Sequence, residues 1–438
     1  MTDAAIAAAP AASASAARPS LALSEHRNLR MVTLILLYVA QGLPFGLIDY
    51  ALPAWLAQNG ASAAAIGGVL AMVILPWTLK LPYGFIMDRY AFLAMGRRRP
   101  WIIFGQFGLG CALLAMAFAN PGVHQIGLLT AFAFSLGLFS AVQDVAVDGL
   151  AVDILPEGEI ERVNGFLFGG QAVGIAAGAA ISGALIGAQG LAAAALVLGG
   201  IIFAILTLVM VVRERPGERL LPWTRGAASQ RNLDLHLGAF GPIIRNLFAA
   251  MFTRQTLILV PAMLAVSATW GIFLGLAPIF SADILGWDKA VYSGWSGQAN
   301  LAAGLLGGLT FGAAAGQWGA RRLFILCAAA TAVLALLMLV LQPNWANPAV
   351  LIAAIFGFTA LNVLRCVTAG SLAMRLCNPA VAATQFAVFM AILNLGRTIA
   401  SASLGWLDSL GGIPAMFAAM TLLSLIAAAF ALAAKVGR

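Results

Sequence analysis

The 438-residue sequence contains very few charged residues, and this scarcity defines the class of protein. Only 9% of the residues are Asp, Glu, Lys or Arg, whereas 62% are hydrophobic. A soluble domain carries about a quarter charged residues, so this chain cannot cover a water-facing surface. The composition excludes a cytosolic enzyme, a secreted disulfide scaffold and a disordered protein. It predicts a polytopic membrane protein.

Cysteine and histidine are also scarce. The four cysteines show no C-x-x-C spacing and the three histidines lie in predicted loops. The sequence therefore predicts no disulfide, no metal site, no cofactor and no histidine proton relay. No Gly-x-Ser-x-Gly or His-x-x-x-His motif lies in the apolar runs, and no phosphate-binding loop occurs, so we expect neither an enzyme nor a nucleotide-driven pump.

Long apolar runs dominate what is present. Each run of about 20 residues is long enough to cross a bilayer. They lie near 30–57, 62–88, 100–119, 126–153, 163–187, 191–212, 255–285, 290–316, 323–341, 349–375, 381–407 and 412–434. We therefore predict an all-α polytopic protein with twelve transmembrane helices in two pseudo-symmetric six-helix halves.

The polar segments predict how the chain is divided. Residues 1–29 are expected to be a disordered cytoplasmic tail, because the Ala/Ser/Pro-rich start lacks the charged beginning of a signal peptide. The N-terminal half is predicted to span 30–212, the C-terminal half 255–438, and a long polar cytoplasmic linker 213–254 to join them.

The formal net charge of +8 comes from basic residues clustered between the apolar runs. This pattern favours the lipid bilayer over nucleic acid as the partner. With the N-terminus inside, nearly all cations fall in cytoplasmic loops, and only Lys289 falls in a loop on the other side. The positive-inside rule thus predicts a multi-pass inner-membrane protein with cytoplasmic N- and C-termini, which we expect to be a monomer.

A basic loop follows the second predicted helix. It reads Gly84-Phe-Ile-Met-Asp88-Arg89 and then Gly96-Arg97-Arg98-Arg99. The pattern resembles the G-x-x-x-D-R-x-G-R-R loop of the major facilitator superfamily, with a longer spacer. We expect Gly84 to permit close helix approach, Asp88 to bind helix-end amides or arginines, and the arginines to hold the loop inside. A second copy, Gly312 to Arg322, has lost the Asp and the first Arg.

Further motifs are similar to one branch of that superfamily. They are Gln41-Gly-Leu-Pro-Phe-Gly46 with Pro76 to Lys80, the run Gln143-Asp144-Val-Ala-Val-Asp148-Gly149, and Ala383 to Ala387 followed by Gly396-Arg397. The branch contains muropeptide permeases, acetyl-CoA transporters and neighbouring siderophore importers. The resemblance implies a secondary transporter working by alternating access.

Two carboxylates in the fourth predicted helix are the first candidate site. Asp144 and Asp148 are four residues apart, so they share one face of the helix. Their repulsion in a low dielectric favours uptake of a proton by one of them. The alternative is a structural latch in which amides or an arginine hold both.

Other charged residues in the predicted spans are expected to have a function or to form ion pairs, because a charge inside the bilayer is costly. Arg365 lies at nearly the depth of the Asp pair, and is either its partner across the halves or an anchor for an anionic substrate group. Asp49 is a proton or cationic-ligand site or an outer-end cap. Arg397 is an anion site or a structural pair, and Lys80 either snorkels or contributes to the site.

Neutral side chains at similar depth could line a cavity or simply join helices by hydrogen bonds. They are Gln41, Gln171, Trp270, Asn362 and Asn394.

The function predicted from these residues is proton-coupled import of a small polar or anionic solute, muropeptide-like or related. The alternatives are a siderophore importer of the same superfamily and a non-transporting membrane assembly factor on the same fold.

Overall fold

A computed structural model describes residues 21–155, 160–234, 241, 245, 248–249, 251–376 and 382–434, and the chain there is helical without β-strands. The N-terminal half contains α1 (Arg27–Gly46), the π-turn η1 (Leu47–Ala51), α2 (Leu52–Gln58), α3 (Ala63–Thr78), α4 (Lys80–Arg89), η2 (Leu93–Met95), α5 (Arg99–Ala119), α6 (Ile126–Ile154), α7 (Ile160–Ala188) and α8 (Leu191–Val211). After α9 (Gln230–Asp234) come α11 (Arg254–Asp283), α12 (Lys289–Trp318), α13 (Ala320–Val340), η4 (Gln342–Asn344), α14 (Pro348–Leu376), α15 (Ala382–Ala402) and α16 (Leu404–Ala433).

These helices reproduce the predicted spans. Ten helical stretches among the described residues are long and apolar enough to cross a membrane. The remaining two predicted spans, near 62–88 and 290–316, correspond to α3 with α4 and to α12. The first span runs from Arg27 to Gln58 without a break. Its Gly42-Leu-Pro44 motif lies in the last turn of α1, and the π-turn η1 follows it.

The two halves share a construction detail at the start of their third helices. Arg99, at the start of α5, donates hydrogen bonds from Nε to the Val209 carbonyl and from Nη2 to the Met210 carbonyl, at the end of α8. Arg321, at the start of α13, makes the same pair of bonds to Ala431 and Leu432 at the end of α16. Each arginine thereby satisfies carbonyls that a helix end leaves free.

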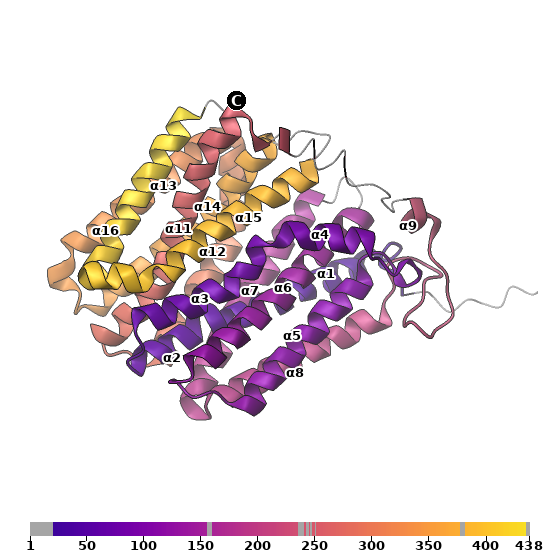
Figure 1. Cartoon of the computed structure of the whole chain (residues 1–438), viewed down its shortest axis with the longest axis horizontal. Coiled ribbons are helices and arrows are strands. Elements are labelled where there is room, and N and C mark those ends of the chain that lie inside the picture. The colour runs from indigo at the N-terminus through magenta and orange to yellow at the C-terminus, as the bar shows by residue number, and fades with distance from the viewer. Residues whose placement is uncertain are drawn as a thin grey trace, which may run out of the picture.

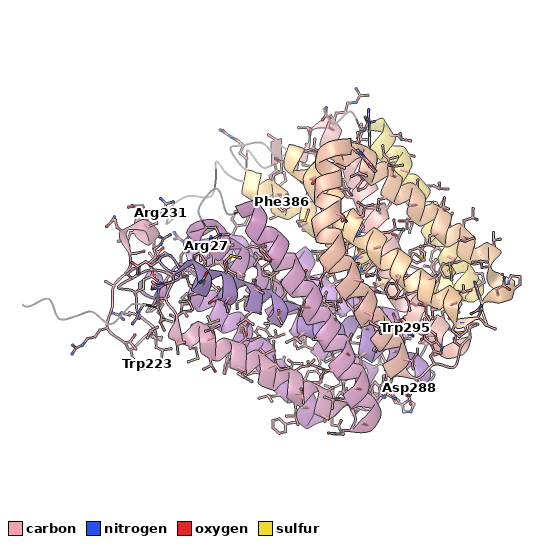
Figure 2. All side chains as sticks on the ribbon, turned by 180° about the vertical axis from the view of Figure 1, so that it is seen from behind. Arg27, Trp223, Arg231, Asp288, Trp295 and Phe386 are labelled. Atoms are coloured by element: carbon pink, nitrogen blue, oxygen red, sulfur yellow. The ribbon has the colours of Figure 1, made fainter. Side chains whose placement is uncertain are left out.

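The halves meet along two pairs of helices. Helix α3 lies against α15, and α7 lies against α12. One end of the bundle carries Arg27, Gly96–Arg99 and residues 213–234, and is called here the basic end. The other carries Gln58, Asn120 and Asp288, and is called the opposite end. The halves converge toward the opposite end and diverge toward the basic end (Figures 1 and 2).

The expectation of a disordered tail over residues 1–29 is wrong for residues 21–29. Ala22 and Leu23 are buried, the Leu23 amide donates to the Arg213 carbonyl at 2.8 Å, and the Arg213 amide donates to the Leu21 carbonyl at 2.8 Å. This short pairing satisfies backbone groups and explains the order. Residues 1–20 lie outside the described residues.

The predicted linker also packs in its first part. Residues 213–234, with α9, lie beneath the basic end of the N-terminal half (Figure 1). Arg215 Nη2 donates to the Asp153 carbonyl at 2.8 Å, and the Arg219 amide donates to the Ala94 carbonyl at 2.7 Å.

Helices α1 and α7 approach each other through glycines, as the Gly170-x-x-x-Gly174-x-x-x-Gly178 spacing predicts. A Cβ added at Gly174 would lie 2.2 Å from the Val39 carbonyl oxygen, and one at Gly178 would lie 2.2 Å from that of Leu43. Only glycine fits such backbone contact.

We expect Gly178→Val to destabilise the N-terminal half by about 1–3 kcal/mol or more, because the branched side chain must push α1 away. Thermal unfolding in detergent measures this. The control is Gly200→Val in α8, where an added Cβ meets nothing within 4 Å. Equal midpoints for the two variants would contradict the packing account.

Candidate functional site

Asp144 lies at the centre of a polar cluster within the N-terminal half. Its carboxylate forms an ion pair with Lys80 Nζ and accepts a hydrogen bond from Gln41 Nε2. Lys80 Nζ also lies 4.2 Å from the centre of the Trp77 ring, a cation–π contact. Only 5% of Asp144 is exposed. The snorkelling alternative for Lys80 is therefore wrong in this structure, since its ammonium turns inward to a carboxylate.

Asp148 has a different environment one turn along α6. Its Oδ1 accepts a hydrogen bond from the Tyr38 hydroxyl at 2.5 Å, and the residue is exposed. Tyr38 and Gln41 are three residues apart on α1, so one face of α1 contacts both carboxylates. Asp144 thus has a cation as its partner, whereas Asp148 has a neutral phenol.

Arg365 does not meet the Asp pair, so the hypothesis of a bridge between them is wrong for this conformation. Its Nε and Nη2 donate to Asn362 Oδ1 at 3.0 and 2.6 Å, and Nη1 donates to Ser267 Oγ at 3.4 Å. The physical reason is that Lys80 already neutralises Asp144 from within the same half.

Asp49 and Arg397 form the ion pair that joins the halves. Arg397 Nη2 on α15 lies 2.5 Å from Asp49 Oδ1 in η1. Asp49 is 5% exposed, and the Arg397 guanidinium lies 6.0 Å from the centre of the Phe45 ring. The outer-end cap predicted as one alternative for Asp49 is wrong, because η1 is inside the first span. For Arg397, the alternative of a structural pair describes this conformation.

Further contacts join the halves on both sides of this ion pair. Asn394 lies one turn before Arg397 on α15, nearer the basic end, and its Nδ2 donates to the Trp77 carbonyl at 3.2 Å. Toward the opposite end, Lys289 Nζ donates to Gln58 Oε1 at 3.1 Å, and a Cβ at Gly67 would lie 2.2 Å from the Ser401 carbonyl oxygen. The halves are therefore in contact from the middle of the spans to the opposite end.

The remaining neutral candidates divide between the halves. Trp270 on α11 packs against Phe273 with ring centres 5.8 Å apart, and it lines a small cavity together with Asn362 and Arg365. Gln171 contributes its backbone carbonyl to the close approach of α7 to Gly42.

The basic loop is organised by a residue that the sequence reasoning missed. Glu214 accepts hydrogen bonds from the backbone amides of Arg97 at 2.9 Å, Arg98 at 2.7 Å and Arg99. Gly96 has φ +104°, and a Cβ there would lie 2.4 Å from the Glu214 carboxyl carbon. This glycine and helix start form an anion site that the linker's own carboxylate occupies.

Arg97 and Arg98 also pair with Asp153, at 3.4 and 3.5 Å, near the end of α6. Asp153 lies five residues after Asp148 in the same predicted helix, and this position could have identified it from the sequence.

The first part of the loop motif behaves differently from the expectation. An added Cβ at Gly84 would meet nothing within 4 Å, so the predicted close approach there is wrong, because α4 lies where the halves diverge. Arg89 is exposed. The side chain of Asp88 lies outside what the structure describes.

Comparison with known proteins places the fold. A family model described as Major Facilitator Superfamily matches residues 34–401. The chain is similar to the anhydromuropeptide permease of Escherichia coli strain K12, with 34% identity over 130 residues, or 30% of this chain and 26% of that one. It is also similar to an uncharacterized protein of Haemophilus influenzae, with 32% identity over 146 residues, or 31% and 34% of the two chains.

These matched stretches thus span about a quarter to a third of the curated relatives. Two solved structures match almost throughout. A mutant of the nucleoside transporter NupG has a TM-score of 0.69 at 10% identity, covering 92% of this chain and 98% of that one. A POT family transporter in complex with a thioalcohol conjugated peptide has a TM-score of 0.65 at 12% identity, covering 92% and 95%.

We expect Lys80→Met to lower the thermal unfolding midpoint, because it leaves the carboxylate of Asp144 buried without a cation. Removing one partner of a buried pair costs about 3–5 kcal/mol, whereas replacing both costs less. The double variant Lys80→Met/Asp144→Asn should therefore recover stability. Arg225→Met, at an exposed side chain of the linker, is the control and should cost under about 1 kcal/mol. A double variant less stable than Lys80→Met would contradict the pairing.

The docked linker should loosen as pH rises. Burial, followed by the neighbouring Glu214 carboxylate, raises the pKa of Glu218 from 4.5 to about 7. A carboxyl whose pKa is raised on folding contributes stability that is complete below pH 4.5 and lost as pH rises through about 7. Hydrogen exchange of residues 213–234, corrected for intrinsic rates, should be faster at about pH 8 than at about pH 6. Glu218→Gln should remove the difference, and a pH-independent wild type would contradict the assignment.

Proposed function

Because the chain belongs to the Major Facilitator Superfamily, we propose that it is a proton-coupled secondary transporter that imports a small polar or anionic solute by alternating access. The proposal takes the basic end as cytoplasmic, which the positive-inside rule supports. In this proposal the chain lies in an inner membrane with both termini in the cytoplasm. The two six-helix halves move relative to each other, the 213–254 linker joins them, and the protein acts as a monomer.

One observation carries the proposal: the Asp49–Arg397 ion pair joins the halves inside the spans, in the part of the bundle nearer the opposite end. A charge pair inside a bilayer is stable only while the two groups stay together. If the halves rock apart at this end, each charge loses its partner unless a proton or a solute group replaces it. The pair is therefore suited to coupling opening with binding.

The proton site that we propose is the Asp144–Asp148 pair. Asp148 supports this role best, because it is exposed and its hydrogen-bond donor is the neutral Tyr38 phenol, while Asp144 is held by Lys80. Protonating Asp148 does not break an ion pair, so it can load and release a proton at low cost.

For the solute we propose a muropeptide-like sugar peptide. The support is the similarity to the Escherichia coli anhydromuropeptide permease, which extends over part of each chain. Arg365 supplies a cation for an acidic group, and the aromatic side chains around it are of the kind that stack on sugar rings.

Uptake of a radiolabelled anhydromuropeptide into proteoliposomes tests the function. With the acidic side outside, we expect accumulation by the wild type and loss of accumulation when the pH gradient is collapsed. Asp148→Asn should still exchange solute down its own gradient but should not accumulate it in response to pH. Arg225→Gln, at an exposed side chain of the linker, is the control and should behave as wild type.

Gradient-independent uptake by the wild type would contradict proton coupling. Uptake of a ferric siderophore but not of the muropeptide would contradict the solute assignment and leave alternating access in place. Absence of uptake of either would contradict the transport proposal in favour of an assembly factor.

A further inference from the structure

The six charged side chains singled out within the spans do not all pair. The carboxylates are Asp49, Asp144 and Asp148, and the cations are Lys80, Arg365 and Arg397. Two ion pairs, Asp49–Arg397 and Lys80–Asp144, account for four of them. Of these six, Asp148 in the N-terminal half and Arg365 in the C-terminal half have no ion-pair partner in the described part of the chain.

The hydrogen-bond partners of Arg365 in the described part of the chain are neutral. Besides Asn362 and Ser267, its Nη2 contacts Cys366 Sγ at 3.3 Å. The residue is 9% exposed. A guanidinium cannot lose its proton to relieve this environment, so only an anion can neutralise it.

A small cavity of about 10 Å³ lies beside Arg365, which in this conformation is room for about one water molecule. The rings of Trp270, Phe273 and Phe358 line it together with the hydroxyl-bearing Thr269 and Thr331. Aromatic walls with a few convergent polar groups and one charge are typical of small-molecule sites.

We propose that Arg365, with Asn362 and Trp270, forms the subsite for a carboxylate group of the solute. This inference rests on the proposed transport function and specifies the solute as an anion. Arg365 binds the carboxylate, Asn362 orients the guanidinium, and the aromatic rings contact the uncharged body next to the acid.

The same charge balance links the anion to the proton. A solute carboxylate at Arg365 and a proton on Asp148 together neutralise the two charges that lack partners. With both bound, no uncompensated charge remains among the six, which favours movement of the halves only when both are present or both absent.

The first test measures equilibrium binding of an anhydromuropeptide to purified protein by tryptophan fluorescence. A second ligand is the same molecule with its peptide carboxylates converted to carboxamides. Arg365→Gln should weaken binding of the acid by about 10-fold or more, the range of a charged hydrogen bond, but should change binding of the amide little. Arg365→Lys should restore part of the affinity for the acid. Equal weakening for both ligands would overturn the subsite, because it indicates a structural role.

A second test needs no solute and stands if the muropeptide assignment fails. In a variant that keeps only Cys366, the rates of modification by an anionic and a cationic methanethiosulfonate are compared. The uncompensated guanidinium beside the thiol should favour the anionic reagent, and Arg365→Gln should reduce the anionic-to-cationic rate ratio several-fold.

The matched control is a variant that keeps only Cys111, in α5. Its anionic-to-cationic rate ratio should not change when Arg365→Gln is added. An unchanged ratio at Cys366, or no modification by either reagent, would overturn the anion subsite even if transport is demonstrated. Normal charge selectivity with no muropeptide binding would instead retain the subsite and reject the proposed solute.

Discussion

The cost of placing charge in a hydrocarbon interior constrains the rest of this structure. The six charges singled out within the spans are placed so that four form two ion pairs, one within the N-terminal half and one between the halves. The pair between the halves, Asp49–Arg397, depends on the two bodies being in contact. A rigid N-terminal half with its own Lys80–Asp144 pair and a second half that carries Arg365 and Arg397 can therefore move relative to each other only by exchanging electrostatic partners.

The distribution of close contacts explains which end is shut. Toward the opposite end, Gly67 meets the Ser401 carbonyl and Lys289 binds Gln58, so backbone and side chain hold the halves together. At the basic end, Asp153 of α6 and the linker residue Glu214 hold the arginine loop. The loop and the first part of the linker are thus fastened to the N-terminal half, and we expect them to move with it as one body.

The sequence predicted the fold well and the site in part. Apolar run length predicts the membrane-spanning helices, because it depends on a local pattern. Lys80, Asp144 and Gln41 were all candidates, but their mutual contact depends on helix rotation, which the sequence does not specify. Depth alone suggested Arg365 as the partner of the Asp144 and Asp148 pair, and that bridge is absent in this conformation because two residues at equal depth can face different neighbours. Glu214 was missed because its role arises from amides of a distant loop rather than from any motif of its own.

The most direct test of alternating access across the Asp49–Arg397 pair is a distance measurement by double electron–electron resonance. In a cysteine-free background, labels at His124 and Ala346 report the opposite end, and labels at Arg89 and Arg322 report the basic end; all four residues are exposed. For Asp49→Asn, we predict a longer population at the opposite end together with a shorter one at the basic end. Distances that stay as in the wild type at both ends, or that lengthen at both, would contradict the account.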